Sequence, residues 1–230
     1  AALGVTQAPL FIQFPEGEIN SADISADEFY TRLEAMRPDL PKTAQPSSGI
    51  FAEIYRRLAE TDKRILSIHI SSGLSGTLGA AHGGAGLVAP QIDVTTWDSL
   101  TLSGGERFQV MAAALAARAG WTLQAILTRL EEIRANTEVV YTLETMEYLA
   151  RGGRIGRVQA LAGMLLAIKP VIRVDHADGK YSTVAKIRTV PRGLATITDH
   201  LHGVYADTPL WVTVLHGRFA EQAEALAGQL

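Results

Sequence analysis

A cluster of small hydroxyl side chains in the first third of the chain has the composition of an anion-binding loop. Residues 65–77 read ILSIHISSGLSGT, so that serines, a threonine and two glycines follow a β-branched apolar run. Glycine lets the backbone approach a ligand, and free N–H groups at a strand-to-helix turn point toward bound anions. Serine and glycine also dominate ordinary turns, so the pattern alone leaves a well-capped turn without a ligand equally open.

A serine hydrolase is an alternative interpretation of the same loop. Ser75 follows Gly73 by two residues, as in a nucleophile elbow, but Thr77 stands where the elbow has its second glycine. The chain has six histidines, and the spacing of none of them selects it as the base of a triad. Acyl hydrolysis therefore stays an alternative to anion binding.

The sequence carries neither a dinucleotide fingerprint nor a pattern of metal ligands. The HGGAG stretch at residues 82–86 lacks the Gly-x-Gly-x-x-Gly order, and no helical pair of histidines stands four residues apart. The absence of cysteine excludes disulfides, thiolate metal sites and a cysteine nucleophile. We expect no cofactor and no metal.

Charge and hydropathy exclude further classes of protein. The formal net charge is -3 and no long basic run occurs, which argues against electrostatic binding of nucleic acid. No apolar run approaches the roughly 18 residues of a membrane span. The first residues, AALGVTQAPLFIQF, lack the basic region and cleavage pattern of a signal peptide. We expect a cytoplasmic protein without stable membrane insertion.

The segments around the serine loop predict an α/β domain with a parallel sheet flanked by helices. Ser25 stands three residues before Glu28, a capping box that predicts a helix ending before Pro38. The apolar runs at residues 64–70 and 91–97 are predicted strands, and each is followed by helical stretches. Such alternation predicts parallel strands with ligands at their carboxyl ends, where the serine loop lies.

Farther along the chain the pattern changes to that of an α+β domain. Residues 170–188 predict a hairpin of antiparallel strands with Asp178–Gly179 as its turn. Residues 158–168 are apolar on nearly every side, which predicts a helix that is buried or lines a cavity. We expect an N-terminal α/β domain over residues 1–135 and a C-terminal α+β domain with antiparallel strands over residues 136–230.

Six segments resemble the DegV family in their order and spacing. They are TAQPSSGIFAEIY, ILSIHISSGLSGT, DSLTLSGGE, LEEIRANT, TMEYLARGGRIGR and LLAIKPVI, and together they span most of the chain. The resemblance implies a bacterial two-domain protein that binds a long-chain fatty acid, such as palmitate, between its domains. It further implies a carrier that presents the lipid carboxylate to a separate ATP-dependent fatty acid kinase and is not itself an enzyme. A regulatory protein with a structural lipid remains a third possibility.

The resemblance also implies which residues bind the carboxylate. The family's carboxylate-binding threonine matches Thr43, although the serine usual after it is Ala44 here, and its partner serine matches Ser75. Supporting candidates are Ser71, Ser72 and the backbone around Gly76. Relative to the family, we expect the chain to begin after the first strand and to stop before a glycine-rich segment with a further histidine.

The stretch at residues 158–168 is the expected wall of the acyl cavity, with Gly163 and Leu166 among its lining residues. At about 0.8 kcal/mol per methylene, burying about fourteen methylenes supplies on the order of 10 kcal/mol before ordering costs. The carboxylate contacts then mainly fix the orientation of the lipid.

Arg154 and Arg188 are the residues that we expect to dock the kinase. A guanidinium group can engage a partner's carboxylate through two hydrogen bonds, which lysine does less well. This expectation requires that both side chains be exposed.

Overall fold

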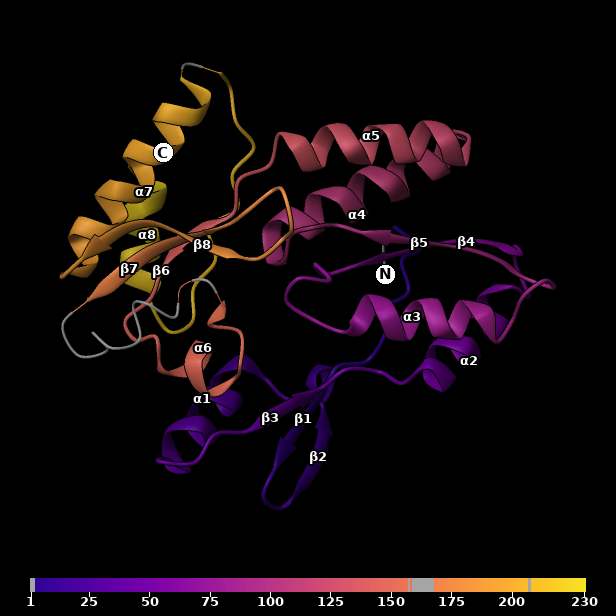
Figure 1. Cartoon of the computed structure of the whole chain (residues 1–230), viewed down its shortest axis with the longest axis horizontal. Helices are drawn as coiled ribbons and strands as arrows, with labels where there is room; N and C mark the ends of the chain where they lie inside the picture. Colours follow the sequence, from indigo (N-terminus) through magenta and orange to yellow (C-terminus); the bar gives the residue numbers. More distant parts are fainter. Residues whose placement is uncertain (1–2, 157, 159–167, 207) are drawn as a thin grey trace. The chain divides into compact units, whose positions relative to one another are not determined.

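The structure, a computed structural model, describes residues 3–156, 158, 168–206 and 208–230 (Figure 1). The chain forms two compact units, one made of Ala1–Ser99 and Gln109–Leu130 and the other of Leu100–Phe108 and Glu131–Leu230. The sequence boundary after residue 135 stays a prediction.

The first unit begins with a small antiparallel sheet. Its strands are β1 (Phe11–Phe14), β2 (Gly17–Asn20) and β3 (Lys42–Ala44), in the order β2-β1-β3. A 3-10 turn, η1 (Ser21–Asp23), and helix α1 (Ala26–Ala35) connect β2 to β3. The predicted start of α1 is confirmed, because Ser25 Oγ accepts the N–H of Glu28 at 3.1 Å.

The same unit contains the predicted parallel pair of strands. Strands β4 (Arg64–His69) and β5 (Asp93–Asp98) are parallel and place His69 opposite Asp98. In Figure 1, helix α3 (Thr77–Gly86) lies on one side of this pair, and helices α4 (Ser103–Arg118) and α5 (Leu123–Ala135) lie on the other. Helix α2 (Ser48–Leu58) packs on α3.

Strand β4 alternates its side chains between two cores, as the period of two of a strand requires. Ile65 packs on the side of α2 and α3, against a cluster formed by Phe51, Ala52, Tyr55, Ala81 and Val88. Leu66 and Ile68 pack on the other side, against Ala113, Ala116, Ile126 and Leu130. Buried apolar surface on both faces thus holds the strand whose carboxyl end carries the serine loop.

Helix α3 is rich in glycine and has little intrinsic helix propensity, and its packing supplies the reason. A Cβ atom on Gly84 would lie 2.6 Å from Cβ of Phe51 and 2.9 Å from the carbonyl oxygen of Ser48. Glycine therefore allows α3 to approach α2 closely. Tertiary packing overrides the weak local preference.

The second unit contains a three-stranded antiparallel sheet, which confirms the predicted fold class. Its strands are β6 (Val140–Thr142), β7 (Lys169–Val174) and β8 (Tyr181–Ile187), in sequential order. The predicted hairpin joins β7 to β8, with the N–H of Asp175 bonded to the carbonyl of Lys180 at 2.8 Å and Gly179 at φ +64°. Among the described residues, the α-helices that lie wholly in this unit are α6 (Glu147–Arg151), α7 (Val190–Tyr205) and α8 (Ala220–Ala227).

The expected cavity wall lies mostly outside the described residues, and Gly163 and Leu166 belong to that part. Val158, at its start, is 1% exposed and packs with Met146 and Ile172. Among the helices that the structure describes, none is long and apolar enough to cross a membrane.

Candidate functional site

Ser71 organises the loop that follows β4. Its side chain is fully buried, and its Oγ accepts the N–H of Gly73 at 3.1 Å. Its carbonyl oxygen accepts the N–H groups of Leu74 and Ser75, both at 3.0 Å. These bonds curl the chain into a compact turn directly before α3. Ser71, one of the predicted site residues, therefore shapes the loop from within.

The loop is also tied to the neighbouring parallel strand. The backbone N–H of Ser72 donates to both carboxylate oxygens of Asp98, at 3.2 and 3.4 Å. Asp98 ends β5, directly opposite His69 in the register of the sheet. The Ser72 side chain is itself exposed at the surface of the loop. The carboxyl ends of both strands thus hold the serine loop in place.

Ser75 lies at the entrance to helix α3. Its hydroxyl lies 2.7 Å from Oγ1 of Thr77 and also accepts the N–H of Thr77 at 3.3 Å. Gly76, between them, is the N-cap residue of α3 and has no side chain to cap the helix. A helix N-terminus carries unsatisfied N–H groups and a partial positive charge, both of which favour an anion. The hydroxyls and this helix end form a donor set suited to a carboxylate.

The segment that follows β3 also lies at the N-terminus of α3. Thr43 lies in β3 opposite Ile12 and has an exposed side chain. The carboxamide of Gln45, two residues later, lies so close to Gly76 that a Cβ atom there would be 2.8 Å from its Oε1. The two predicted carboxylate-binding segments are therefore neighbours within one unit. That Thr43 and Ser75 share a ligand stays a proposal.

His69 belongs to a row of hydrogen-bonded polar side chains in the core. Its Nε2 lies 2.8 Å from Oγ of Ser67, which lies 2.9 Å from the hydroxyl of Tyr55. Its ring packs edge-to-face with the ring of Phe51, and the two ring centroids are 5.3 Å apart. Burial lowers the pKa of His69 to about 4, although the nearby carboxylate of Asp98 opposes the shift. His69 is therefore a neutral core histidine near pH 7.

The hydrogen bonds of Ser75 bear on the alternative of acyl hydrolysis. A nucleophilic serine needs a histidine or another base within hydrogen-bond reach. Among the described residues, the hydroxyl of Ser75 is bonded to Thr77 and to no histidine. Nor do the described residues contain a cluster of histidine, aspartate and glutamate side chains that could hold a metal ion.

The two arginines predicted to dock a partner are both exposed and lie in the second unit. Nη1 of Arg154 donates to the carbonyl oxygen of Gly152 at 2.6 Å, just beyond α6. Arg188 directly follows the end of β8. Their exposure meets the requirement of the docking hypothesis, whereas their use in docking stays a prediction.

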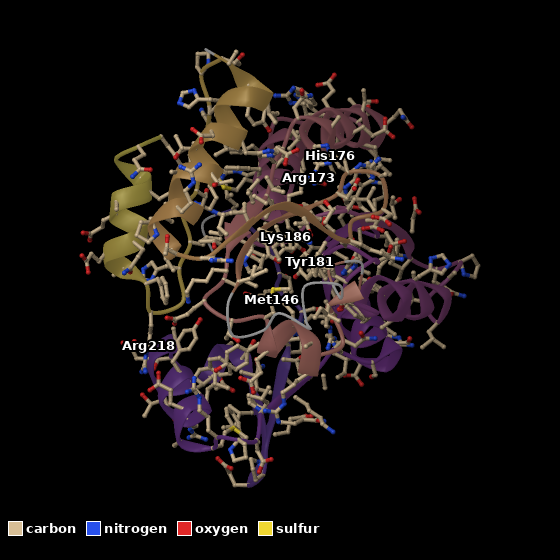
Figure 2. All side chains as sticks on the ribbon, turned by 60° about the vertical axis from the view of Figure 1, so that its left-hand side comes forward. Met146, Arg173, His176, Tyr181, Lys186 and Arg218 are labelled. Atoms are coloured by element: carbon tan, nitrogen blue, oxygen red, sulfur yellow. The ribbon has the colours of Figure 1, made fainter. Side chains whose placement is uncertain are left out.

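The second unit also contains a polar cluster that the sequence did not predict. Glu138, with a side chain only 3% exposed, lies 3.1 Å from Nη1 of Arg173, 3.3 Å from Nε2 of His176 and 3.4 Å from Nε2 of His200. Figure 2 labels Arg173 and His176, which lie near the carboxyl end of β7. Glu138, the end of β7 and His200 are far apart in the sequence, so no local spacing could have indicated the cluster.

The other residue that sequence reasoning missed is Gln45. Its position two residues after Thr43 in an extended segment was the available indication, because alternate residues of a strand share a face. Its contact with Gly76 depends on tertiary structure.

Comparisons with known proteins point to one family. The model of the family described as "Uncharacterised protein, DegV family" matches residues 1–230. A DegV domain-containing protein of Deinococcus radiodurans is 37% identical over 228 residues, which cover 98% of this chain and 78% of that protein.

Two solved structures extend this similarity to the fold. A fatty-acid-binding DegV family protein from Thermus thermophilus matches with a TM-score of 0.81 and 30% identity, over 90% of this chain and 72% of its own. DegV of Bacillus subtilis, described as a fatty acid binding protein, matches with a TM-score of 0.84 and 26% identity, over 99% of this chain and 80% of its own.

Proposed function

Because the chain belongs to the DegV family, we propose that it binds a long-chain fatty acid, with palmitate as the representative ligand. The observation that carries the proposal is the donor set at the start of α3, where the hydroxyls of Ser75 and Thr77 lie at a helix N-terminus whose N-cap residue has no side chain. The fatty-acid-binding proteins of Thermus thermophilus and Bacillus subtilis share this fold.

In this proposal, Thr43 and Ser75 hold the carboxylate from two sides. Ser75 Oγ already accepts one N–H from Thr77, so its own proton is available either to Thr77 Oγ1 or to a ligand oxygen. Thr43 lies in the strand that leads to Gln45, which contacts Gly76 beside Ser75. Ser71 and Ser72 fix the loop through their bonds to Gly73 and Asp98.

The acyl chain supplies most of the binding free energy in this proposal, and the apolar stretch at residues 158–168 forms the wall. Gly163 and Leu166 are the lining residues that the sequence suggests. A large side chain at Gly163 would occupy the space of the lipid, so Gly163→Leu should weaken retention of long chains more than of short ones.

The proposed role is that of a carrier in the cytoplasm and not of an enzyme. The carrier presents its loaded carboxylate to an ATP-dependent fatty acid kinase, which forms the acyl-phosphate. Exposed Arg154 and Arg188 are the proposed docking residues. Among the described residues the hydroxyl of Ser75 is hydrogen-bonded to Thr77 and to no histidine, which favours a carrier over a hydrolase.

Native mass spectrometry of the purified protein, followed by lipid extraction, tests the proposal. We expect one fatty acid per chain, and about tenfold weaker palmitate binding in Ser75→Ala, the loss that corresponds to one hydrogen bond to a charged group. Thr183→Ala, which removes an exposed hydroxyl from β8, is the control and should bind normally. A purified protein that neither carries nor takes up fatty acid, or that turns over acyl esters, contradicts the proposal.

A further inference from the structure

The side chain of Gln45 occupies the space beside the Cα atom of Gly76. A Cβ atom at residue 76 would lie 2.8 Å from Oε1 and 2.9 Å from Nε2 of Gln45, closer than side-chain atoms pack. The backbone of Gly76 has φ -77° and ψ 2°, a conformation that other residues adopt without strain. A side chain at residue 76 would therefore displace the carboxamide of Gln45, which is the far end of a flexible side chain.

This placement puts an amide group among the hydroxyls at the start of α3. Ser75 and Thr77 flank Gly76, and their hydroxyl oxygens are 2.7 Å apart. A carboxamide offers two N–H donors and one carbonyl acceptor. Gln45 is exposed, and within the described part of the chain its side chain has no hydrogen-bond partner. The amide therefore has donors available for a ligand at this point.

Gln45 stands one residue beyond the end of β3 and two residues after Thr43. Successive side chains of an extended segment point to opposite faces, so residues 43 and 45 share one face. Thr43 and Gln45 are both exposed, whereas Ala44 between them is partly buried. An anion that contacts Thr43 and Ser75 thus lies on the side to which Gln45 belongs.

We propose that Gln45 is a ligand-binding residue that donates a hydrogen bond from Nε2 to the carboxylate of the bound fatty acid, with Gly76 giving the carboxamide room. This inference rests on the proposed function, since it requires a carboxylate at the start of α3. It adds a selective element, because an amide donor stabilises an ionised carboxylate more strongly than an uncharged hydroxyl headgroup.

Two substitutions of Gln45 separate charge from hydrogen bonding. Gln45→Glu keeps the size of the side chain but places a negative charge beside the ligand carboxylate. Gln45→Met keeps the length and removes the donors. We expect palmitate affinity to fall about tenfold in Gln45→Met, near the lower end of the range for a hydrogen bond to a charged group. In Gln45→Glu the two negative charges also repel each other, so the loss should exceed about thirtyfold. Binding of 1-hexadecanol, which has no carboxylate, should change less than about twofold.

A third substitution tests the role of Gly76. Gly76→Ala places a methyl group where the carboxamide lies and displaces it, so we expect palmitate affinity to fall, but by no more than in Gln45→Met. If both act through the same hydrogen bond, the double variant should lose no more than Gln45→Met alone. Gln124→Glu, at an exposed position of α5, is the matched control and should bind palmitate like the unmodified protein.

The outcomes distinguish this inference from the function on which it rests. Unmodified protein that binds palmitate, together with Gln45→Glu and Gln45→Met variants within about twofold of it, overturns the role of Gln45 and leaves the lipid site standing. Equal losses for palmitate and 1-hexadecanol also overturn it, because they indicate a general disturbance of the site. Unmodified protein that binds no palmitate overturns the proposed function, and this inference with it.

Discussion

The backbone N–H of Ser72 donates to the carboxylate of Asp98, which stands 26 residues later and ends the neighbouring parallel strand. This bond fastens the serine loop to the sheet at the edge where α/β proteins bind ligands. We predict that Asp98→Ala lowers the free energy of unfolding by about 1.5–3 kcal/mol, the range for a lost hydrogen bond to a charged group. Urea unfolding measures the loss. Asp98→Asn keeps an acceptor and should lose less, and equal losses in the two variants would contradict this explanation.

A second prediction concerns the partner. Arg154→Ala and Arg188→Ala should each slow acyl-phosphate formation by the cognate kinase at least about threefold, because charges at an interface rim mainly change the association rate. Palmitate binding should stay normal, since neither residue belongs to the proposed carboxylate site.

Arg192→Ala, which removes another exposed arginine of the second unit, is the control for this experiment. The kinase rate is measured with each loaded variant at low salt. Rates equal to those of the unmodified protein in both Arg154→Ala and Arg188→Ala would show that docking uses another surface.

Glu106 supplies a prediction about pH. Burial in the first turn of α4 raises the pKa of Glu106 from its ordinary 4.5 to about 7. The folded protein therefore holds this proton more tightly than the unfolded chain does. The stabilisation of the fold that comes from the protonated Glu106 carboxyl group is fully present below about pH 4.5. It is lost as the pH rises through 7. Glu106→Gln should flatten the fall in melting temperature between about pH 5 and pH 8.

The exposed Glu131 in α5 provides the comparison, and Glu131→Gln should leave that pH profile unchanged. Differential scanning calorimetry at both pH values measures the effect. A Glu106→Gln variant with the same decrease as the unmodified protein would show that another group titrates in this range.

A further prediction concerns the stability of the second unit. The Glu138 side chain is buried, is hydrogen-bonded to Arg173 and His200 and lies 3.3 Å from His176, so Glu138→Ala removes several polar contacts at once. We expect a loss of about 2–4 kcal/mol in the free energy of unfolding. Glu144→Ala breaks an exposed pair with Lys169 at 3.9 Å and should cost less than about 1 kcal/mol. Guanidinium denaturation of both variants checks the difference, and similar losses would argue against a structural role for the buried carboxylate.

The elements around the site were predictable where their determinants are local. Ser25 and Glu28 mark the start of α1, and Asp178–Gly179 marks the turn of the hairpin, because caps and tight turns depend on residues a few positions apart. The β-branched run before the serine loop likewise indicated a buried parallel strand. The fold class followed from the order of these elements.

The contacts between distant segments could not be predicted in the same way. The meeting of Gln45 with Gly76, and of Glu138 with His200, depends on how whole elements pack. Helix α3 also depends on tertiary packing. Its glycines weaken the local preference for a helix, but they permit its close packing on α2. For the carboxylate site, the resemblance named Thr43 and Ser75, and their joint use stays a prediction.

The hydrogen bonds that link Tyr55, Ser67 and His69 restrict the register of β4 relative to its neighbours. A slip of β4 by one residue would turn Ser67 and His69 toward the apolar side chains of α4 and α5, where their hydrogen-bonding atoms would lose their partners. A sheet held by apolar residues on both faces has little else to penalise such a shift. The buried imidazole therefore helps to fix the register of β4, and with it the position at which the serine loop begins.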